Sequence, residues 1–194
     1  TVNHPGDAIV IPRRLRSDKV DYECELVVVI GKRCLNATKE NALDYVLGYT
    51  CGNDVSARTF QQGDVQWWRA KGSDTFGPCG PYIVSGLDFD NLRLQLRHNG
   101  QVVQDEMTSE LVHDVATTVS FISQHVTLQP GDLIFMGTPG TTSVIKPGDV
   151  IAVTDMAGQE SFGQIRKIGV RAVSVTTRDQ REYLIPNENL MVNQ

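Results

Sequence analysis

Residues 21–30 read DYECELVVVI, and this stretch decides how the rest of the sequence is interpreted. It predicts a β-strand, because Val27 to Ile30 form a β-branched run that a glycine and a lysine follow. Glu23 and Glu25 lie two residues apart, so both side chains leave one face of the strand, while Cys24 points into the core. Two carboxylates at this separation are stable if water solvates them, if one is protonated, or if a cation lies between them.

A third carboxylate, Asp54, lies in the polar stretch of residues 52–58, which reads GNDVSAR. Three carboxylates without a soft ligand suit a hard, oxygen-seeking ion such as Mg²⁺, Mn²⁺ or Ca²⁺. Six-fold coordination would leave positions for water and a chelating substrate. An ordinary exposed strand face remains the alternative for Glu23 and Glu25 considered alone.

Outward from this stretch, the pattern is dominated by strands. Leucines alternate with polar residues from Leu92, and Asn99-Gly100 then predicts a hairpin with a tight turn. Two Pro-Gly turns each precede a short apolar strand, at residues 133–134 and 150–151. Residues 170–183 predict a further hairpin.

Two helices are expected. Thr38 is a candidate N-cap for a short helix whose apolar face holds residues 42, 43, 46 and 47 and which ends at Gly48. Asp114 is a candidate N-cap for a longer helix with Val115 and Val119 on one face. We expect Trp67 and Trp68 to pack rather than to stack on bases.

Length and composition limit the class of protein. The 194 residues are 40% hydrophobic and 21% charged, which suits one compact domain over residues 1–194. The net charge of −5 argues against a nucleic-acid or membrane partner, and the cluster Arg13, Arg14 and Arg16 is interpreted as a solvated loop. The four cysteines show no Cys-x-x-Cys spacing and no run of residues could span a bilayer, which favours a reducing, cytoplasmic compartment. A mitochondrial location is the alternative if a targeting segment lies upstream.

Four ordered motifs give a resemblance to a known family. They are DYECEL at residues 21–26, NDVSAR at 53–58, AKGSDTFGP at 70–78 and GTPG at 137–140. In these motifs the sequence resembles the fumarylacetoacetate hydrolase superfamily over residues 20–171, in its acylpyruvase and oxaloacetate decarboxylase or tautomerase branch. The resemblance implies a mainly β fold with short helices, a mixed β-sandwich roll of the type formed by the family's C-terminal domain. Homodimerisation is common in the family.

The resemblance also implies a function. Glu23, Glu25 and Asp54 are then the ligands of Mg²⁺ or Mn²⁺, with Ca²⁺ as a substitute in crystals. The cation would hold a small 2-oxo acid and stabilise the enolate formed when a C–C bond breaks or a proton moves. The expected reactions are oxaloacetate decarboxylation or tautomerisation, and C–C hydrolysis of acylpyruvates.

Four other residues have two interpretations each. Lys71 is a surface lysine by composition and an active-site proton donor by resemblance. Arg58 is either a structural partner of Asp54 or a catalytic group, and Gln61 would share a helical face with both. Thr138 belongs to an ordinary Gly-Pro turn or offers its hydroxyl and backbone N–H groups to the substrate; by resemblance Gln61, Lys71 and Thr138 contact the substrate.

Hydrolytic members of the family resemble one another in an N-terminal lid that carries a His–Glu pair. That pair is not identifiable in residues 1–194, so decarboxylation and tautomerisation rank at least level with hydrolysis. A member without catalytic activity, which keeps the cation as a binding or scaffold protein, is the alternative.

Overall fold

A computed structural model describes residues 1–11, 19–154, 160–167, 172–176 and 182–186. The described chain consists mostly of strands with a few short helices, as the sequence predicts. None of its helices is long and apolar enough to cross a membrane. The cluster Arg13, Arg14 and Arg16 lies outside the described residues.

The first sheet is built around the predicted β-branched strand, which is buried along its whole length. Side chains alternate along it, so Leu26 and Val28 join the main hydrophobic core, while Glu25 and Val27 leave the opposite face. The order of the strands in this sheet is β1 (Val2–Asn3), β7 (Gly77–Val84), β5 (Val46–Asn53), β4 (Cys24–Ile30) and β10 (Leu133–Phe135).

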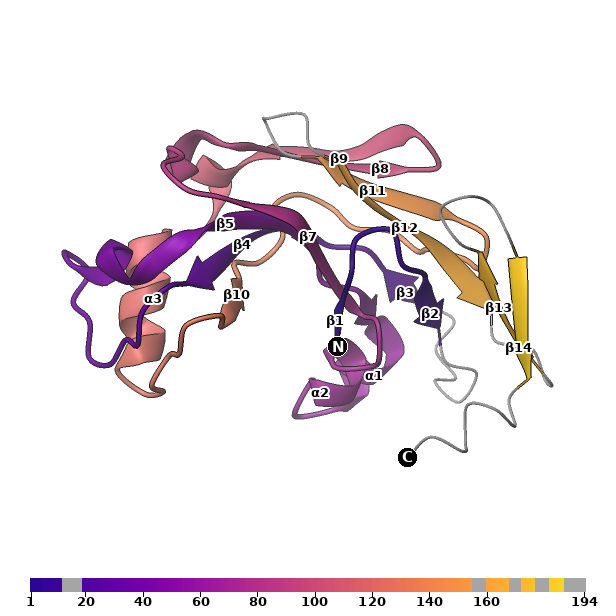
Figure 1. The fold of residues 1–194 in the computed structure, drawn as a ribbon, viewed down its shortest axis with the longest axis horizontal. Coiled ribbons are helices and arrows are strands. Elements are labelled where there is room, and N and C mark those ends of the chain that lie inside the picture. Colours follow the sequence, from indigo (N-terminus) through magenta and orange to yellow (C-terminus); the bar gives the residue numbers. More distant parts are fainter. Residues whose placement is uncertain (12–18, 155–159, 168–171, 177–181, 187–194) are drawn as a thin grey trace.

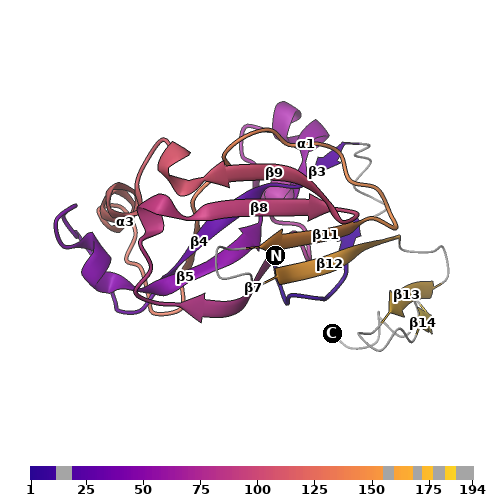
Figure 2. The same cartoon turned by 90° about the horizontal axis from the view of Figure 1, so that it is seen from above.

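The second sheet curves over the first (Figure 1). Its strands, in order, are β2 (Ile9–Ile11), β12 (Glu160–Lys167), β11 (Val150–Thr154), β8 (Arg93–His98) and β9 (Gln101–Met107). Seen from above, β8 and β9 lie across β4 and β5 (Figure 2). Leu94 and Leu96 of β8 and Val153 of β11 belong to the same buried cluster as Leu26 and Val28, so the main core lies between the two sheets.

Two small strand pairs complete the fold: β3 (Val20–Asp21) with β6 (Ser56–Ala57), and β13 (Ala172–Thr176) with β14 (Glu182–Pro186). The helices flank the first sheet: α3 (Val115–Ser123) lies at one end, and α1 (Arg58–Gly63) and α2 (Trp68–Lys71) lie towards the other (Figure 1). Within the described residues, short 3-10 helices cover 42–45, 89–91 and 108–110.

Most predicted elements are confirmed. The hairpin β8–β9 turns at Asn99 and Gly100, which both have positive φ, and Asp114 caps α3 through Thr117 N. The expected strand over residues 21–30 is divided between β3 and β4.

The helix expected after Thr38 is wrong. Only a 3-10 turn forms at residues 42–45, and Val46 already begins strand β5. A six-residue apolar pattern cannot outweigh pairing with two neighbouring strands. Gly48 does not end a helix but lies within β5, where a Cβ atom would come within 2.6 Å of the Val84 carbonyl oxygen of β7.

Candidate active site

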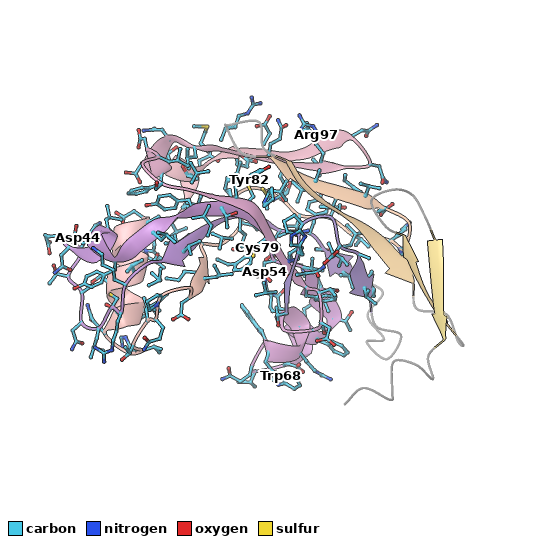
Figure 3. All side chains as sticks on the ribbon, in the orientation of Figure 1. Asp44, Asp54, Trp68, Cys79, Tyr82 and Arg97 are labelled. Atoms are coloured by element: carbon cyan, nitrogen blue, oxygen red, sulfur yellow. The ribbon has the colours of Figure 1, made fainter. Side chains whose placement is uncertain are left out.

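Three carboxylates converge where β4 begins and β5 ends. Cys24 pairs with Asn53 in the β4–β5 ladder, and the backbone N–H of Asp54 donates to the Glu23 carbonyl oxygen at 2.9 Å. This pairing brings one oxygen from each of Glu23, Glu25 and Asp54 within 4.8 Å of one another. Asp54 lies on the side of the sheet that faces α1 and α2 (Figure 3).

Two cationic side chains from the helices reach these carboxylates. Lys71 ends α2, and its Nζ lies 2.6 Å from Glu23 Oε2 and also contacts Asp54 Oδ2. Arg58 begins α1, and its guanidinium lies 2.7 Å from Glu23 Oε1 and 2.8 Å from Asp21 Oδ2. Glu23 is therefore held between the two helices.

The loop at residues 137–142 contacts the site from the side of β10. Gly137 N donates to Glu25 Oε2 at 2.8 Å, which a glycine permits because its φ is +92°. Thr142 Oγ1 accepts a hydrogen bond from Arg58 at 2.8 Å. The carboxylates, the guanidinium and this loop thus form one connected network.

Burial and like charge control protonation in this network. Burial, followed by the neighbouring Asp54 carboxylate, raises the pKa of Glu25 to about 8, although the Gly137 amide opposes the shift. Burial also raises the pKa of Asp54, despite the hydrogen bond from Lys71. Burial would lower the pKa of Lys71, but its hydrogen bonds to Asp54 and Glu23 outweigh burial and raise it.

These residues fit a divalent cation. With Asp21 included, the site holds four carboxylates and the two cations Arg58 and Lys71, and these six described groups together carry two negative charges when all are ionised. A proton on Glu25 at neutral pH relieves half of this excess, whereas a doubly charged ion relieves all of it. The donors are carboxylate oxygens throughout, which is the ligand type that Mg²⁺, Mn²⁺ and Ca²⁺ prefer.

Comparison with known proteins now identifies the family. The family model described as fumarylacetoacetate (FAA) hydrolase C-terminal matches residues 1–169. The chain belongs to the fumarylacetoacetate hydrolase family. The resemblance in the four sequence motifs is thereby confirmed.

Relatives and solved structures agree with this membership. An uncharacterised protein of Archaeoglobus fulgidus is 48% identical over 164 residues, which cover 84% of this chain and 61% of the relative. The protein named oxaloacetate tautomerase fahd2, mitochondrial, of Xenopus laevis is 40% identical over 159 residues, 76% of this chain and 49% of that protein. The crystal structure of 2-hydroxyhepta-2,4-diene-1,7-dioate isomerase from Mycobacterium marinum superposes with a TM-score of 0.83 at 42% identity, covering 87% of this chain and 66% of the other.

The similarity in structure confirms the predicted fold class, a mainly β fold of the fumarylacetoacetate hydrolase type. The chain spans about three fifths of the length of three curated relatives, each 48% identical to it.

The structure brings most predicted site residues of this family member together. Glu23, Glu25, Asp54, Arg58 and Lys71 form the network itself. Gln61 reaches it through Arg58, whose NH1 group donates to Gln61 Oε1 at 2.8 Å. The roles predicted for these residues stay predictions.

Thr138 is also adjacent, but its hydroxyl group is already engaged. It donates to the Cys24 carbonyl oxygen at 2.8 Å and accepts from Gln104 at 2.9 Å. The hydroxyl therefore has no proton left to donate to a substrate.

Two local expectations differ from the structure. Helix α1 begins only at Arg58, and Arg58 pairs with Asp21 and Glu23 instead of sharing a helical face with Asp54. The short strand β6 lies between Asp54 and α1 and prevents that arrangement. Trp67 and Trp68 do not pack in the core; they are 53% and 76% exposed. Trp68 begins the four-residue helix α2 and points away from the sheets (Figure 3).

No role was predicted for four further residues that contact the site: Asp21, Asn53, Gln104 and Thr142. Asp21 continues the alternation of Glu23 and Glu25, so the spacing held a signal for it. Asn53 Oδ1 accepts from Glu23 N at 2.9 Å and so ends the ladder beside the site. Gln104 and Thr142 are distant in sequence, and no local pattern marks them.

Proposed function

We propose that this chain is the catalytic domain of a divalent-metal-dependent enzyme that acts on a small 2-oxo acid. The single observation that carries the proposal is the convergence of Glu23, Glu25 and Asp54 beside a lysine ammonium group. We infer that residues 1–194 form one such domain, that the three carboxylates hold Mg²⁺ or Mn²⁺, and that the protein is a homodimer.

The reaction that the site supports best is formation of an enolate next to the 2-oxo group, either by loss of a proton in tautomerisation or by loss of CO₂ in decarboxylation of oxaloacetate. A cation held by the carboxylates supplies Lewis-acid polarisation of the 2-oxo group. The relative named as an oxaloacetate tautomerase and the solved isomerase support this class of reaction. C–C hydrolysis of acylpyruvates remains the second candidate, on the ground of family membership.

Lys71 is the residue that we assign to proton transfer. Its ammonium group is polarised between Asp54 and Glu23, which hold its proton in a fixed place. A nearby divalent charge would oppose the upward shift of its pKa and make it a better acid. In tautomerisation a proton leaves C3 of the substrate and another is delivered to the 2-oxo oxygen, so a group that both gives and takes protons suffices.

Arg58 has a different role in the proposal. Its guanidinium donates to Asp21, Gln61 and Thr142 and pairs with Glu23, so it holds the carboxylate and supplies positive potential. Gln61 and the backbone of Thr138 are the groups that we assign to substrate binding, with Lys71.

The test is an assay of the full-length protein against oxaloacetate and a set of acylpyruvates, with Mg²⁺, with Mn²⁺ and with chelator. We expect turnover that chelator abolishes. We expect Lys71→Met to lose at least about 100-fold in kcat, the usual scale for a general acid, without weaker Mn²⁺ binding. Glu40→Gln is the control, because it removes one charge at an exposed position and should leave activity unchanged.

Two results would overturn the proposal. One is the absence of metal-dependent turnover of any substrate; metal binding without turnover would favour the scaffold alternative. The other is a Glu25→Gln variant with wild-type activity and wild-type metal affinity.

A further inference from the structure

Gln104 is a buried polar residue of β9, in the sheet that lies across from the carboxylates. It is 3% exposed, and it lies opposite the fully buried Leu96 of β8. A buried amide costs free energy unless its polar atoms are bonded, so its partners show what it does.

The carboxamide makes three hydrogen bonds, all to segments that form the site. Oε1 accepts from Cys24 N at 2.9 Å, and Nε2 donates to Thr138 Oγ1 at 2.9 Å and to the Pro139 carbonyl oxygen at 3.0 Å. If the amide were flipped, its NH2 group would face the Cys24 N–H and its oxygen would face the Pro139 carbonyl oxygen, so neither hydrogen bond could form. Both donors and the acceptor of the amide are therefore used.

Thr138 closes this arrangement into a ring. Its hydroxyl donates its only proton to the Cys24 carbonyl oxygen and accepts from Gln104. Both backbone polar groups of Cys24 are thus bonded to side chains of the ring, and Cys24 is the residue between Glu23 and Glu25.

The ring also fixes the group that contacts Glu25. Gly137 directly precedes Thr138, and its N–H donates to Glu25 Oε2 at 2.8 Å. A loop that Gln104 holds at residues 138 and 139 keeps this N–H in place. Gln104 therefore restrains both the strand that carries the two glutamates and the amide that orients one of them.

We propose that Gln104 is a positioning residue, which acts through Thr138 and Gly137 to orient the Glu25 carboxylate for the cation. This inference rests on the proposed function for the cation, but the restraint of the loop does not depend on it. Loss of a residue that orients a metal ligand typically weakens metal binding by about 10- to 100-fold.

The experiment compares Gln104→Met and Thr138→Val with the wild-type protein by two measurements. The Mn²⁺ dissociation constant, measured by electron paramagnetic resonance, should rise about 10- to 100-fold in both variants. Amide hydrogen exchange at Gly137, measured by NMR without metal, should become faster in both. Thr138→Ser keeps the hydroxyl group and should restore both values.

Leu96→Val is the matched control, because it removes one buried methylene group directly opposite Gln104 and leaves the polar ring intact. We expect it to lower stability without changing Mn²⁺ affinity or exchange at Gly137. If Gln104→Met does not fold, the same two measurements on Thr138→Val and Gln104→Glu test the positioning role. Gln104→Glu keeps the acceptor for Cys24 N–H and loses both donors to the loop.

Unchanged Mn²⁺ affinity in folded variants of a metal-binding wild-type protein would overturn the inference, as would unchanged exchange at Gly137. If the wild-type protein binds no Mn²⁺, the proposed function fails separately. Faster exchange at Gly137 would then still support the positioning role, and unchanged exchange would overturn it.

Discussion

Glu25 experiences the strongest conflict between burial and charge among the carboxylates of the site. Its side chain is 2% exposed, and the Asp54 and Glu23 carboxylates lie beside it. Burial first and Asp54 second raise its pKa to about 8, so Glu25 is protonated at neutral pH in the metal-free protein.

This protonation gives the metal-free protein a specific pH dependence. Between pH values near 4.5 and 8, folded Glu25 binds a proton that the unfolded chain has lost. The free energy of unfolding therefore falls as the pH rises through this range, by up to about 1.4 kcal/mol per pH unit from this group. We expect urea denaturation in chelator to show this fall in the wild-type protein, and Glu25→Gln to lack it.

Glu40→Gln is the control for that measurement, because Glu40 is exposed and distant from the carboxylates in the sequence. It should retain the wild-type dependence on pH. Identical pH profiles for Glu25→Gln and the wild-type protein would contradict the assigned protonation state.

At the residue scale, the carboxylates and both cationic groups were predicted, because the short motifs that contain them carry the resemblance to the family. How they are held was not predicted. Asp21 was within reach of the strand alternation, but Gln104 lies 80 positions from Cys24, to which it is bonded. Only packing between the two sheets creates that contact.

At the scale of elements, the ladder between β4 and β5 depends on a residue without a side chain. Gly52 lies opposite Glu25, and a Cβ atom there would come within 2.4 Å of Val27 Cγ2 and 2.6 Å of Phe135 Cε1. Three strands therefore meet too closely at this point for any side chain.

We expect Gly52→Ala to destabilise the protein by about 1–3 kcal/mol, because overpacking forces buried neighbours to move. The measurement is the free energy of unfolding from urea denaturation. Gly63→Ala is the matched control, since a Cβ atom at Gly63 meets nothing within 4 Å, and its stability should stay within about 0.5 kcal/mol of wild type. Equal effects of the two substitutions would contradict this account.

The cap of α3 gives a second prediction for an element. Asp114 Oδ1 accepts from Thr117 N at 2.6 Å, and Oδ2 lies 2.7 Å from Lys39 Nζ. The hydrogen bond with Lys39, followed by those with Thr117, lowers the pKa of Asp114 to about 2. Its contribution is therefore complete above pH 4 and is lost as the pH falls towards 2.

Asp114→Ala should lower the free energy of unfolding by about 1 kcal/mol at neutral pH, the usual value of an N-cap. Lys39→Ala removes only an exposed ion pair, which is worth between about 0 and 1 kcal/mol, and is the control. Thermal unfolding of both variants checks the prediction, which fails if Lys39→Ala costs more than Asp114→Ala.

The elements also show why local patterns succeed or fail. The turn of β8–β9 and the cap of α3 are each specified by residues within four positions of one another, and both were predicted. Residues 42–47 have a helical pattern, but from Val46 onwards the chain forms strand β5, which pairs with β4 and β7. Contacts distant in sequence decided this segment, and no short pattern contains them.

At the scale of the whole molecule, the site depends on segments from residue 21 to residue 142, which meet only in the folded chain. A cation that binds this site binds the folded protein in preference to the unfolded chain. Mg²⁺ or Mn²⁺ should therefore stabilise the protein, by about 2.7 kcal/mol at 100 times its dissociation constant.

Thermal unfolding with increasing metal concentration checks this expectation, and chelator should reverse the effect. Glu25→Gln should respond to metal less than the wild-type protein, and Glu40→Gln should respond equally. Equal stabilisation of all three proteins would place the cation elsewhere on the molecule.

Gln104 joins β9 of the second sheet to Cys24 of the first and to the loop beside the carboxylates, so the proposed metal site is complete only when both sheets are in place. A partly folded chain that has formed only the β4–β5 ladder would have its carboxylates but not the fixed loop beside them. High affinity for the ion would then arrive only when the second layer docks.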